Sequence, residues 1–242
     1  MKRNNTGGFD LDIITHVFLT GAGISAESGL PTFRGEGGLW RNHRPEDLAD
    51  YNTWKSNYDL VHDFYSMRRA KLAEVEPNAA HRAIAEMGER VLNLTQNVDN
   101  LFERAGCCNI VHLHGRLWTM KCEACGHDWE IGAKPWSAAD RCPNCNSRKG
   151  VKPGVVMFHE GAPNYSYLGL LPQLDARHTL VVMGTSGNVL NIDSHVRFSN
   201  AGTKILNNAE WSVLIDDRLF DHVFYEPATS AIHKIIRLAE PR

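Results

Sequence analysis

The stretch from His16 to Gly35 reads HVFLTGAGISAESGLPTFRG. An apolar run, Val17–Leu19, leads directly into Gly21-Ala22-Gly23, and Ala26 completes the pattern G-x-G-x-x-G/A. In a dinucleotide-binding strand–turn–helix, the first glycine makes the turn, the second lets the backbone approach a pyrophosphate, and the small third residue lets the helix pack closely. The N–H groups and positive dipole end of the helix then face the phosphates. A tight strand–helix turn without a ligand has the same local sequence.

The residues that follow do not fit a dehydrogenase. Such an enzyme carries an acidic residue about 20 positions later, at the end of a second strand. Here Glu46 and Asp47 lie instead in Gly35–Ser56, a loop-like stretch rich in Gly, Asn, Asp and Trp. The pattern therefore indicates a nucleotide site of another kind.

The composition predicts a globular protein. The chain has 242 residues, 43% of them apolar, and a formal net charge of −2, which suits one large domain or one large and one small domain. The charge argues against a general nucleic-acid surface. No apolar run approaches the ~20 residues of a membrane helix, and the first ten residues lack a signal-peptide core. We expect a soluble, cytoplasmic protein, monomeric because coiled-coil heptads are lacking.

Apolar runs alternate with helical patterns. Six runs are predicted as buried parallel strands: Val17–Thr20, Val91–Thr95, Ile110–Leu113, Leu180–Met183, Thr203–Leu206 and Val213–Ile215. Helices are predicted at Asp59–Glu74, Asn78–Gly88 and Phe220–Leu238. The alternation predicts an α/β fold, a Rossmann-like parallel sheet with helices on both faces.

Four cysteines form two pairs, Cys122-x2-Cys125 and Cys142-x2-Cys145, with sixteen residues between the pairs. This spacing predicts a four-thiolate zinc site, because each pair makes a tight knuckle and two knuckles complete a tetrahedron. Disulfides would suit a short secreted chain instead. The surrounding segment, Arg116–Gly150, has few apolar residues, so its folding would depend on the metal. We predict a small zinc-binding domain inserted beside the sheet and packed with the helical stretch near residues 36–75.

Polar residues follow several predicted strands, at the edge where ligands bind in open α/β sheets. TQNVDN, from Thr95 to Asn100, offers Gln96, Asn97 and Asp99 as ligands for a carboxamide and a water. An Asx turn that caps the next helix explains the same residues equally well.

His112-Leu113-His114-Gly115 ends another strand and places both histidines on one face. A histidine here is a candidate general base because its pKa lies near neutral pH; the alternative is a structural histidine. Gly184-Thr185-Ser186-Gly187, and Asn208 with Glu210, end two further strands. Each is weak alone, but together these strand ends suit one extended nucleotide.

Taken together, these segments resemble the sirtuins, NAD-dependent protein-lysine deacylases, and in particular the bacterial and mitochondrial desuccinylase type. GAGISAESGLPTFRG, TQNVDN, HLHG, the two CxxC pairs, KPGVVMFHE and GTS occur in the family's order and approximate spacing, from about residue 14 to 238. The resemblance implies NAD as co-substrate, one structural zinc, and acylated lysines of proteins or peptides as partners. It implies no membrane or nucleic-acid partner.

The resemblance also implies a reaction. The acyl-lysine carbonyl oxygen attacks the ribose carbon as nicotinamide leaves, His114 is the general base on a ribose hydroxyl, and the products are free lysine and O-acyl-ADP-ribose. Asn97 and Asp99 would orient the nicotinamide carboxamide and a water. The stretch after the glycines would close over NAD. The implied NAD-binding residues are Gly21, Ala22, Gly23, Glu27, Thr32, Phe33, Arg34, Gln96, Asn97, Asp99, Gly184, Thr185, Ser186, Asn208, Glu210 and Ala228.

Two segments resemble the family's acyl-peptide site. Val155–Phe158, with Val155, Val156 and Phe158 as substrate residues, resembles a strand that pairs with the peptide backbone. Tyr65 and Arg68 match the Tyr-x-x-Arg signature of sirtuins that remove succinyl and other acidic acyl groups, and lie on one helix face. The guanidinium could hold a carboxylate, and Ala49 would leave room for a longer chain. A solvated arginine beside a core tyrosine is the alternative.

Three positions depart from the family's usual residues: His159 and Glu226 stand where glycine is usual, and Asn191 where proline is usual. They affect expected affinity and substrate range. Two other functions stay open: an NAD-consuming ADP-ribosyltransferase or NAD hydrolase using the same pocket, and a zinc-ribbon binding module. The expected large domain comprises residues 9–34, 76–116 and 152–242; the small domain comprises 35–75 and 117–151.

Overall fold

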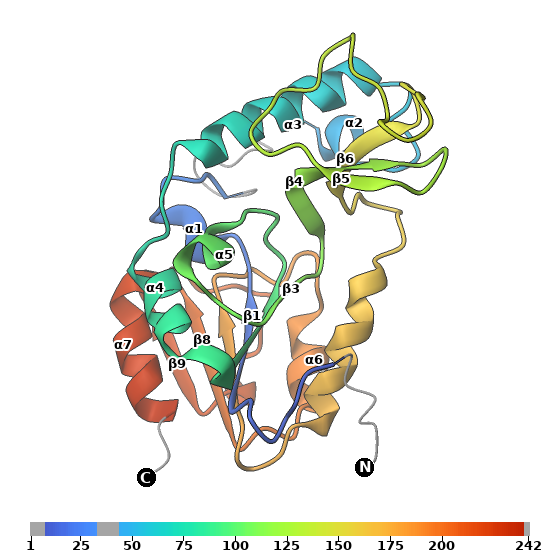
Figure 1. Cartoon of the computed structure of the whole chain (residues 1–242). Helices are drawn as coiled ribbons and strands as arrows, with labels where there is room; N and C mark the ends of the chain where they lie inside the picture. Colours follow the sequence, from blue (N-terminus) through green and yellow to red (C-terminus); the bar gives the residue numbers. More distant parts are fainter. Residues whose placement is uncertain (1–7, 33–43, 240–242) are drawn as a thin grey trace.

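The computed structural model describes residues 8–32 and 44–239 (Figure 1). Its main element is a parallel six-stranded sheet in the order β3-β2-β1-β7-β8-β9. The strands are β1 (His16–Thr20), β2 (Val91–Thr95), β3 (Ile110–His112), β7 (Thr179–Met183), β8 (Thr203–Asn208) and β9 (His222–Tyr225). The strand order reverses between β1 and β7, so a ligand crevice is expected at their carboxyl ends.

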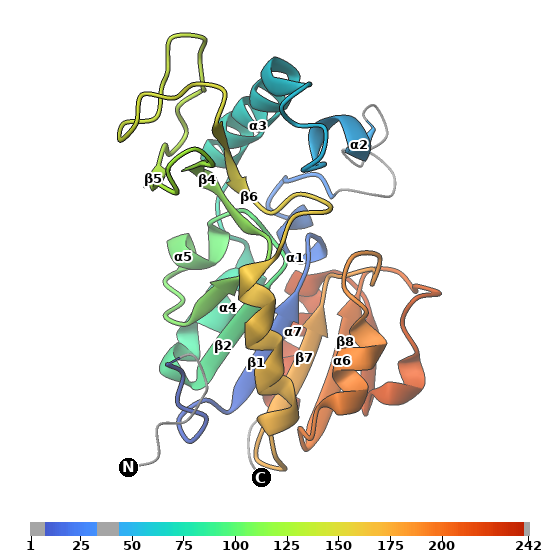
Figure 2. The same ribbon diagram turned by 90° about the vertical axis from the view of Figure 1, so that its right-hand side faces the viewer.

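Alternating side chains of the strands form two apolar layers. Val17 and Leu19 of β1 face one cluster, whereas Phe18 between them faces the other. The first layer is covered by η3 (Pro163–Gln173) and α6 (Ile192–Phe198). The second is covered by α1 (Gly23–Ala26), α4 (Ala79–Glu86), α5 (Leu101–Ala105) and α7 (Ala228–Ala239). Figure 2 shows η3 and α6 in front of the sheet, with α4 and α7 behind it. The expected α/β class with helices on both faces is confirmed.

A second, antiparallel sheet lies beyond the carboxyl ends of the first (Figure 1). It has the order β5-β4-β6, from β4 (Gly115–Cys122), β5 (Asp128–Glu130) and β6 (Val151–Val155). With α2 (Pro45–Leu48) and α3 (Tyr58–Ala73) it encloses a third apolar cluster. The Tyr58 hydroxyl donates to the Arg148 carbonyl at 2.7 Å, and the backbone N–H of Trp136 donates to Ser66 Oγ at 3.1 Å. The cysteine-rich segment therefore packs on the helical stretch, as expected.

Helix α4 begins where the sequence predicts. The Asn78 side chain accepts hydrogen bonds from the backbone N–H groups of Ala80 and His81, and the His81 ring bonds back to the Asn78 N–H. This reciprocal capping box satisfies donors that a helix start leaves without partners. The short helices η2 (Gly88–Arg90) and η4 (Asp217–Leu219) lead into β2 and β9.

The prediction was wrong near the C-terminus. Val213–Ile215 forms a turn rather than a strand, and Val213 is 78% exposed. The sixth strand is β9, inside the predicted helix Phe220–Leu238; it pairs with β8 at the sheet edge, and the helix begins only at Ala228. Apolar residues can be exposed, so a short apolar run is a weak strand signal. The proline at 227 fits the start of a helix better than its interior.

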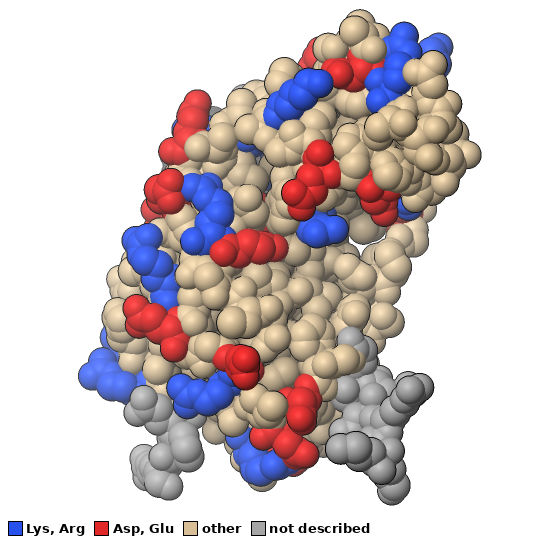
Figure 3. Space-filling view, in the orientation of Figure 1, with Lys and Arg blue, Asp and Glu red and all other residues tan. Residues whose placement is uncertain are grey.

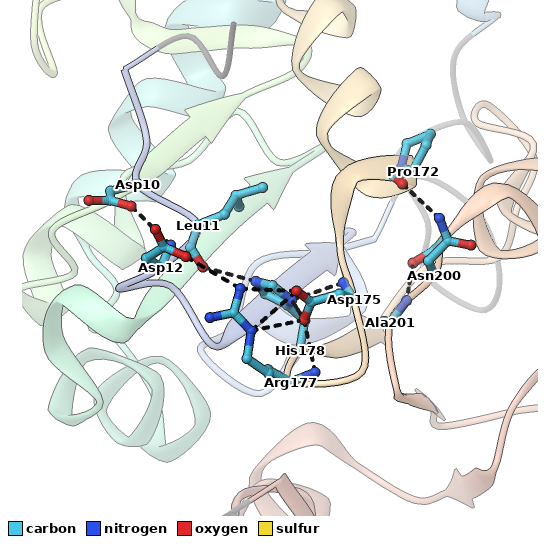
Figure 4. A network of polar contacts seen from close by, with 10 residues as sticks. Asp10, Leu11, Asp12, Pro172, Asp175, Arg177, His178, Asn200 and Ala201 are labelled. Carbon is cyan, nitrogen blue, oxygen red and sulfur yellow. Dashed lines mark hydrogen bonds and ion pairs between the residues drawn. The ribbon is translucent and has the colours of Figure 1, made fainter. Parts of the chain in front are cut away.

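The described N-terminal segment is bound to the turn before β7 (Figure 4). The buried His178 ring bonds the Leu11 carbonyl at 3.0 Å and the Asp175 carboxylate at 2.8 Å. Arg177 joins Asp175 to Asp12 across the exposed side of this contact. Neighbouring Arg177 and His178 hold the pKa of Asp175 well below its usual range. We call these five residues the N-terminal clasp.

Acidic and basic side chains alternate on the face drawn in Figure 3, in keeping with the small net charge. Among the helices within residues 8–32 and 44–239, none has the length and apolar content needed to cross a bilayer.

Candidate functional site

A cavity of about 770 Å³ lies against the carboxyl ends of the central strands and extends to the second sheet. Residues after β1, β2, β7 and β8 form one part of its wall; α3 and the segment after β6 form another. This size is typical of a small-molecule or cofactor site. The cavity lies where the reversal of strand order predicts it.

The turn after β1 interlocks with the end of β7. The Gly23 N–H donates to the Gly184 carbonyl at 2.8 Å, and the Gly21 N–H donates to the Met183 carbonyl at 3.0 Å. A Cβ on Gly23 would lie 2.7 Å from the Gly184 Cα, and Gly184 itself has a φ of +67°. Gly21 and Gly23 are thus required because a side chain at either position would collide with the backbone of Gly184, in addition to any approach of the backbone to phosphate. Helix α1 has only four residues, which limits the dipole that the motif leads one to expect.

Asn97 and Asp99 meet at Ser25. The Asn97 amide donates to Ser25 Oγ at 3.0 Å, and Ser25 donates to Asp99 Oδ2 at 3.0 Å. Asn97 lines the cavity, whereas Asp99 is buried behind it. Burial raises the pKa of Asp99, and hydrogen bonds from the Leu101 N–H and Ser25 oppose that rise. Asp99 is therefore connected to the cavity-lining Asn97 through Ser25, a residue that was not predicted to belong to the site.

The two histidines of the HLHG motif bond neighbouring carbonyls. His114 Nδ1 lies 3.0 Å from the Gln96 carbonyl, and His112 Nδ1 lies 2.8 Å from the Asn97 carbonyl. His112 is buried, and its Nε2 lies 2.7 Å from a carboxylate oxygen of Glu103. His114 lines the cavity, and burial lowers its pKa. Of the two, only His114 has access to a ligand there.

The ends of β7 and β8 are joined by two hydrogen bonds between the Asn208 side-chain amide and the Thr185 backbone. Asn208 Oδ1 accepts from the Thr185 N–H, and Asn208 Nδ2 donates to the Thr185 carbonyl, both at 2.9 Å. The Gln96 amide donates to Thr185 Oγ1 at 3.1 Å, which connects β2 to the same point. These hydroxyl and amide groups are neutral, fixed partners of the kind that bind ribose and phosphate oxygens. The donor set therefore fits a dinucleotide.

Glu27 and Ala228 link the cavity to α7. The carboxylate of Glu27 accepts from the Thr229 hydroxyl at 2.6 Å and from the Thr229 N–H at 3.0 Å. An acidic side chain at a helix start satisfies free N–H groups and interacts favourably with the helix dipole. Glu226, one of the departures from the family pattern, forms an ion pair with Lys234 at 2.7 Å.

Ala49, Tyr65 and Arg68 line the opposite part of the wall. The Arg68 guanidinium carbon lies 5.9 Å from the Tyr65 ring centroid and 5.8 Å from that of Phe64. Burial raises the pKa of Tyr65 to about 12, so its hydroxyl stays a donor at neutral pH. Burial also lowers the pKa of Arg68, although arginine stays charged throughout the neutral range.

The segment after β6 is already hydrogen-bonded. The Val156 N–H donates to the His114 carbonyl at 2.8 Å, and the Phe158 N–H donates to the Ala49 carbonyl at 2.7 Å. The Met157 N–H donates to the Glu160 carboxylate at 2.9 Å. Val155, Val156 and Phe158, the expected substrate residues, line the cavity, but these donors are occupied, so peptide pairing would have to use other backbone groups.

His159, which stands where the family usually has glycine, has a φ of +63°. A residue other than glycine in this region is uncommon and costs free energy. Its Nδ1 lies 3.0 Å from the Asp50 carboxylate, while the side chain is 67% exposed. The segment after β6 is thereby bound to the loop before α3, next to the cavity mouth.

The four paired cysteines converge as the spacing predicts. The sulfur atoms of Cys122 and Cys145 lie 3.6 Å apart, those of Cys125 and Cys142 lie 3.7 Å apart, and all four lie within 4.8 Å of one another. Four thiolates at about 2.3 Å from one zinc ion in a tetrahedron are about 3.8 Å apart. The sulfur positions fit zinc, and they are too far apart for disulfides.

Nearly all predicted ligand-binding residues that the structure describes line this one cavity, and Asp99 is the exception. Phe33 and Arg34 lie outside the described residues. Tyr165 and Trp211 also line the cavity, although neither was predicted from the sequence. Neither stands in a recognisable motif. The one sequence signal for Trp211 is that a large aromatic residue directly follows Glu210 in a polar loop, and its side chain is 64% exposed. The individual roles of the lining residues stay predictions.

Comparisons with known proteins agree with the motifs. The model of the Sir2 family matches residues 21–191. A Helicobacter hepaticus protein named NAD-dependent protein deacylase is 40% identical over 243 residues, which cover 90% of this chain and 94% of that protein. A Campylobacter jejuni protein of the same name is 40% identical over 223 residues, covering 90% of this chain and 93% of that protein.

Solved structures give the same result. A Sir2 homologue in complex with NAD has a TM-score of 0.81 and 35% identity, over 93% of this chain and 88% of that chain. A mutant Sir2 homologue bound to ADP-ribose also has a TM-score of 0.81 and 35% identity, over 93% and 91%. The family inferred from the motifs is confirmed: this chain belongs to the Sir2 family.

Proposed function

We propose that this protein is an NAD-dependent protein-lysine deacylase whose reaction takes place in the cavity between the two sheets. The observation that carries the proposal is the continuity of that cavity. Its wall includes the strand ends suited to a dinucleotide, the pair Tyr65 and Arg68, and His114. Two reactants can therefore occupy one space, and holding them in register is a large part of such catalysis. The relatives named as deacylases support this proposal.

The chain's own groups supply binding and proton transfer. When bound, NAD supplies the reactive glycosidic bond between nicotinamide and ribose. His114 is neutral at pH 7 because burial lowers its pKa, so its Nε2 accepts a proton from a ribose hydroxyl. The Gln96 carbonyl holds the other ring nitrogen. The amide of Asn97, fixed by Ser25, orients the nicotinamide carboxamide.

We further propose that the acyl pocket accepts groups ending in a carboxylate, such as succinyl and malonyl, as well as acetyl. Arg68 supplies a permanent positive charge on the cavity wall, and the protonated Tyr65 hydroxyl supplies a neutral donor beside it. A guanidinium and a carboxylate form short, charge-assisted hydrogen bonds. The small side chain of Ala49 on the same wall leaves volume for the longer acyl chain.

The test compares matched peptides that carry acetyl-lysine or succinyl-lysine, with NAD, and follows the products by mass spectrometry. The wild type should give free lysine and O-acyl-ADP-ribose from both peptides. Arg68→Met should lose about 10–100-fold in kcat/KM on the succinyl peptide, the size of one or two charged hydrogen bonds, and change little on the acetyl peptide. Arg68→Lys keeps the charge but lacks the planar guanidinium, so its kcat/KM on the succinyl peptide should lie between those of the wild type and Arg68→Met.

Two outcomes would contradict these proposals separately. An equal loss on both peptides would mean that Arg68 supports the fold of the pocket and does not read a carboxylate. Nicotinamide release with neither peptide changed would mean that NAD is spent on water or on another acceptor. His114→Ala is the control for the site, because it should abolish product while zinc content and unfolding temperature stay unchanged.

A further inference from the structure

The cavity wall contains a contact that the proposed reaction does not use. The Tyr165 hydroxyl lies 2.8 Å from Nε2 of His114, and the two ring centroids are 5.7 Å apart at 45°. Tyr165 lies on η3, far from His114 in the sequence, and both line the cavity. The nitrogen that must take up a proton is therefore already hydrogen-bonded to a tyrosine.

The partners of His114 determine where its ring proton sits. A neutral imidazole has one N–H donor and one acceptor nitrogen. The Gln96 carbonyl, 3.0 Å from Nδ1, can only accept, so Nδ1 carries the proton. Nε2 then holds the lone pair, and the Tyr165 hydroxyl must be the donor in the second bond. The opposite tautomer would place a lone pair against the Gln96 carbonyl.

We propose that Tyr165 is a positioning residue for His114. In the free protein the Tyr165 hydroxyl holds the imidazole as the neutral Nδ1–H tautomer. The hydroxyl leaves Nε2 when a hydroxyl of the ligand takes its place. This inference rests on the proposed role of His114 as the base. Gln96 and Tyr165 hold the ring at opposite nitrogens, so they fix both its plane and its proton. The ligand hydroxyl then replaces one oxygen at Nε2 with another, and the ring does not need to turn.

The surroundings of His114 favour the same protonation state. Burial is the largest cause that lowers its pKa, and the bond to Gln96 opposes it. Burial also raises the pKa of Tyr165, so this hydroxyl remains a donor at neutral pH. The other titratable side chains that line the cavity are Glu27, Tyr65, Arg68, His159, Glu160 and Glu210. None of these six is among the causes that shift the pKa of His114.

The variant Tyr165→Phe removes the hydroxyl and keeps the ring. The hydroxyl donates to Nε2 of the neutral ring and can accept from the Nε2–H of the charged ring, so its loss changes the hydrogen bonding of both states and should shift the pKa of His114 by roughly 0.5–1 unit, the size of one hydrogen bond. Tyr167→Phe is the matched control, because it removes a hydroxyl two residues further along η3, where the ring packs on Phe9 at 5.9 Å. That control should leave the pKa of His114 unchanged.

The first measurement is a pH titration of nitrogen-15 histidine signals in the ligand-free protein, with His114→Gln to assign the resonance. Both proteins should show the Nδ1–H tautomer, because the Gln96 carbonyl accepts from Nδ1 in each, and Tyr165→Phe should show a shifted pKa. An unchanged pKa in Tyr165→Phe would overturn the inference. A change of the same size in Tyr167→Phe would also overturn it, because the effect would then be general to η3.

The second measurement is the pH dependence of deacylation. The acid limb of kcat/KM, which reports the free protein, should move in Tyr165→Phe in the same direction and by the same amount as the titration. The limb of kcat should stay in place, since the tyrosine has left Nε2 in the complex. A shift in both limbs would contradict displacement of Tyr165. A titration shift without deacylation of any peptide would instead refute the proposed function and leave the positioning role standing.

Discussion

Replacing Gly184 by alanine tests whether the site depends on the interlock between β1 and β7. Gly184 has a φ of +67°, and a Cβ there would lie 2.4 Å from the backbone nitrogen of Ile24 and 2.8 Å from the carbonyl carbon of Gly23. Both are backbone atoms of the segment after β1, so neither can rotate away as a side-chain end would. The turn or the strand end has to move.

The magnitude has two parts. The left-handed conformation costs a residue with a Cβ about 1–2 kcal/mol, and forcing an extra carbon into a packed interior costs about 1–3 kcal/mol. Gly184→Ala should therefore destabilise the fold by about 2–5 kcal/mol. Gly88 has a φ of +63°, and a Cβ there would meet no atom of the described residues within 4 Å. Gly88→Ala should therefore cost only the free energy of the left-handed conformation. Both substitutions restrict the unfolded chain equally, and the difference isolates the close approach.

The assay is urea unfolding of both variants, followed by calorimetric titration with ADP-ribose. Gly184→Ala should unfold at the lower urea concentration and bind ADP-ribose more weakly, because the displaced turn carries Gly21 and Gly23 on the cavity wall. Gly88→Ala should bind like the wild type. Equal loss of stability in the two variants, with equal binding, would refute the interlock as the reason for these glycines.

Three further predictions concern stability. Removing zinc with a strong chelator should lower the unfolding temperature and change tryptophan fluorescence, because the metal supplies folding energy to such modules; metal analysis should find one zinc per chain. Burial lowers the pKa of His62 and of His81 to about 4. The unfolded chain therefore binds more protons below pH ~6.5, and stability should be full above that pH and fall by up to about 3 kcal/mol per histidine as the pH drops toward 4; urea titrations at several pH values test this. In the N-terminal clasp, the His178 side chain is 2% exposed and that of Arg177 is 61% exposed. Unfolding measurements should therefore show a loss of about 1–3 kcal/mol for His178→Ala and a much smaller loss for Arg177→Met, because exposed ion pairs contribute little.

Much of the fold could be predicted because its signals are local. Five of the six strands of the main sheet are buried apolar runs, such as Val91–Thr95, that follow or precede turn residues. The zinc site follows from spacing alone, since two knuckles leave little freedom for four sulfurs. The strand-end motifs converge because the carboxyl ends of parallel strands meet at one edge of a sheet.

The remaining features depend on contacts between distant segments. Strand β9 is short and lies at the sheet edge, so His222–Tyr225 looks no more strand-like than the exposed residues Val213 and Leu214. Asp99 is linked to Asn97 through a hydrogen bond with Ser25, 74 positions before Asp99 in the sequence. The contact of Tyr165 with His114 spans 51 positions and belongs to no motif. Such pairings carry no periodic signal in the sequence.

The two ends of the cavity are supported by different parts of the protein. The dinucleotide end is built on the six-stranded sheet, whereas Tyr65 belongs to the apolar cluster of α3 and the second sheet. Among the bonds that join these parts near the site are the one from the Val156 N–H to the His114 carbonyl and that from the Phe158 N–H to the Ala49 carbonyl. The first of these hydrogen bonds is accepted by the backbone carbonyl of His114, the proposed base. If the proposed function holds, substitutions in the cluster should change which acyl group is held while the strand ends keep the dinucleotide in place, and the register between the two reactants should depend on the segment after β6.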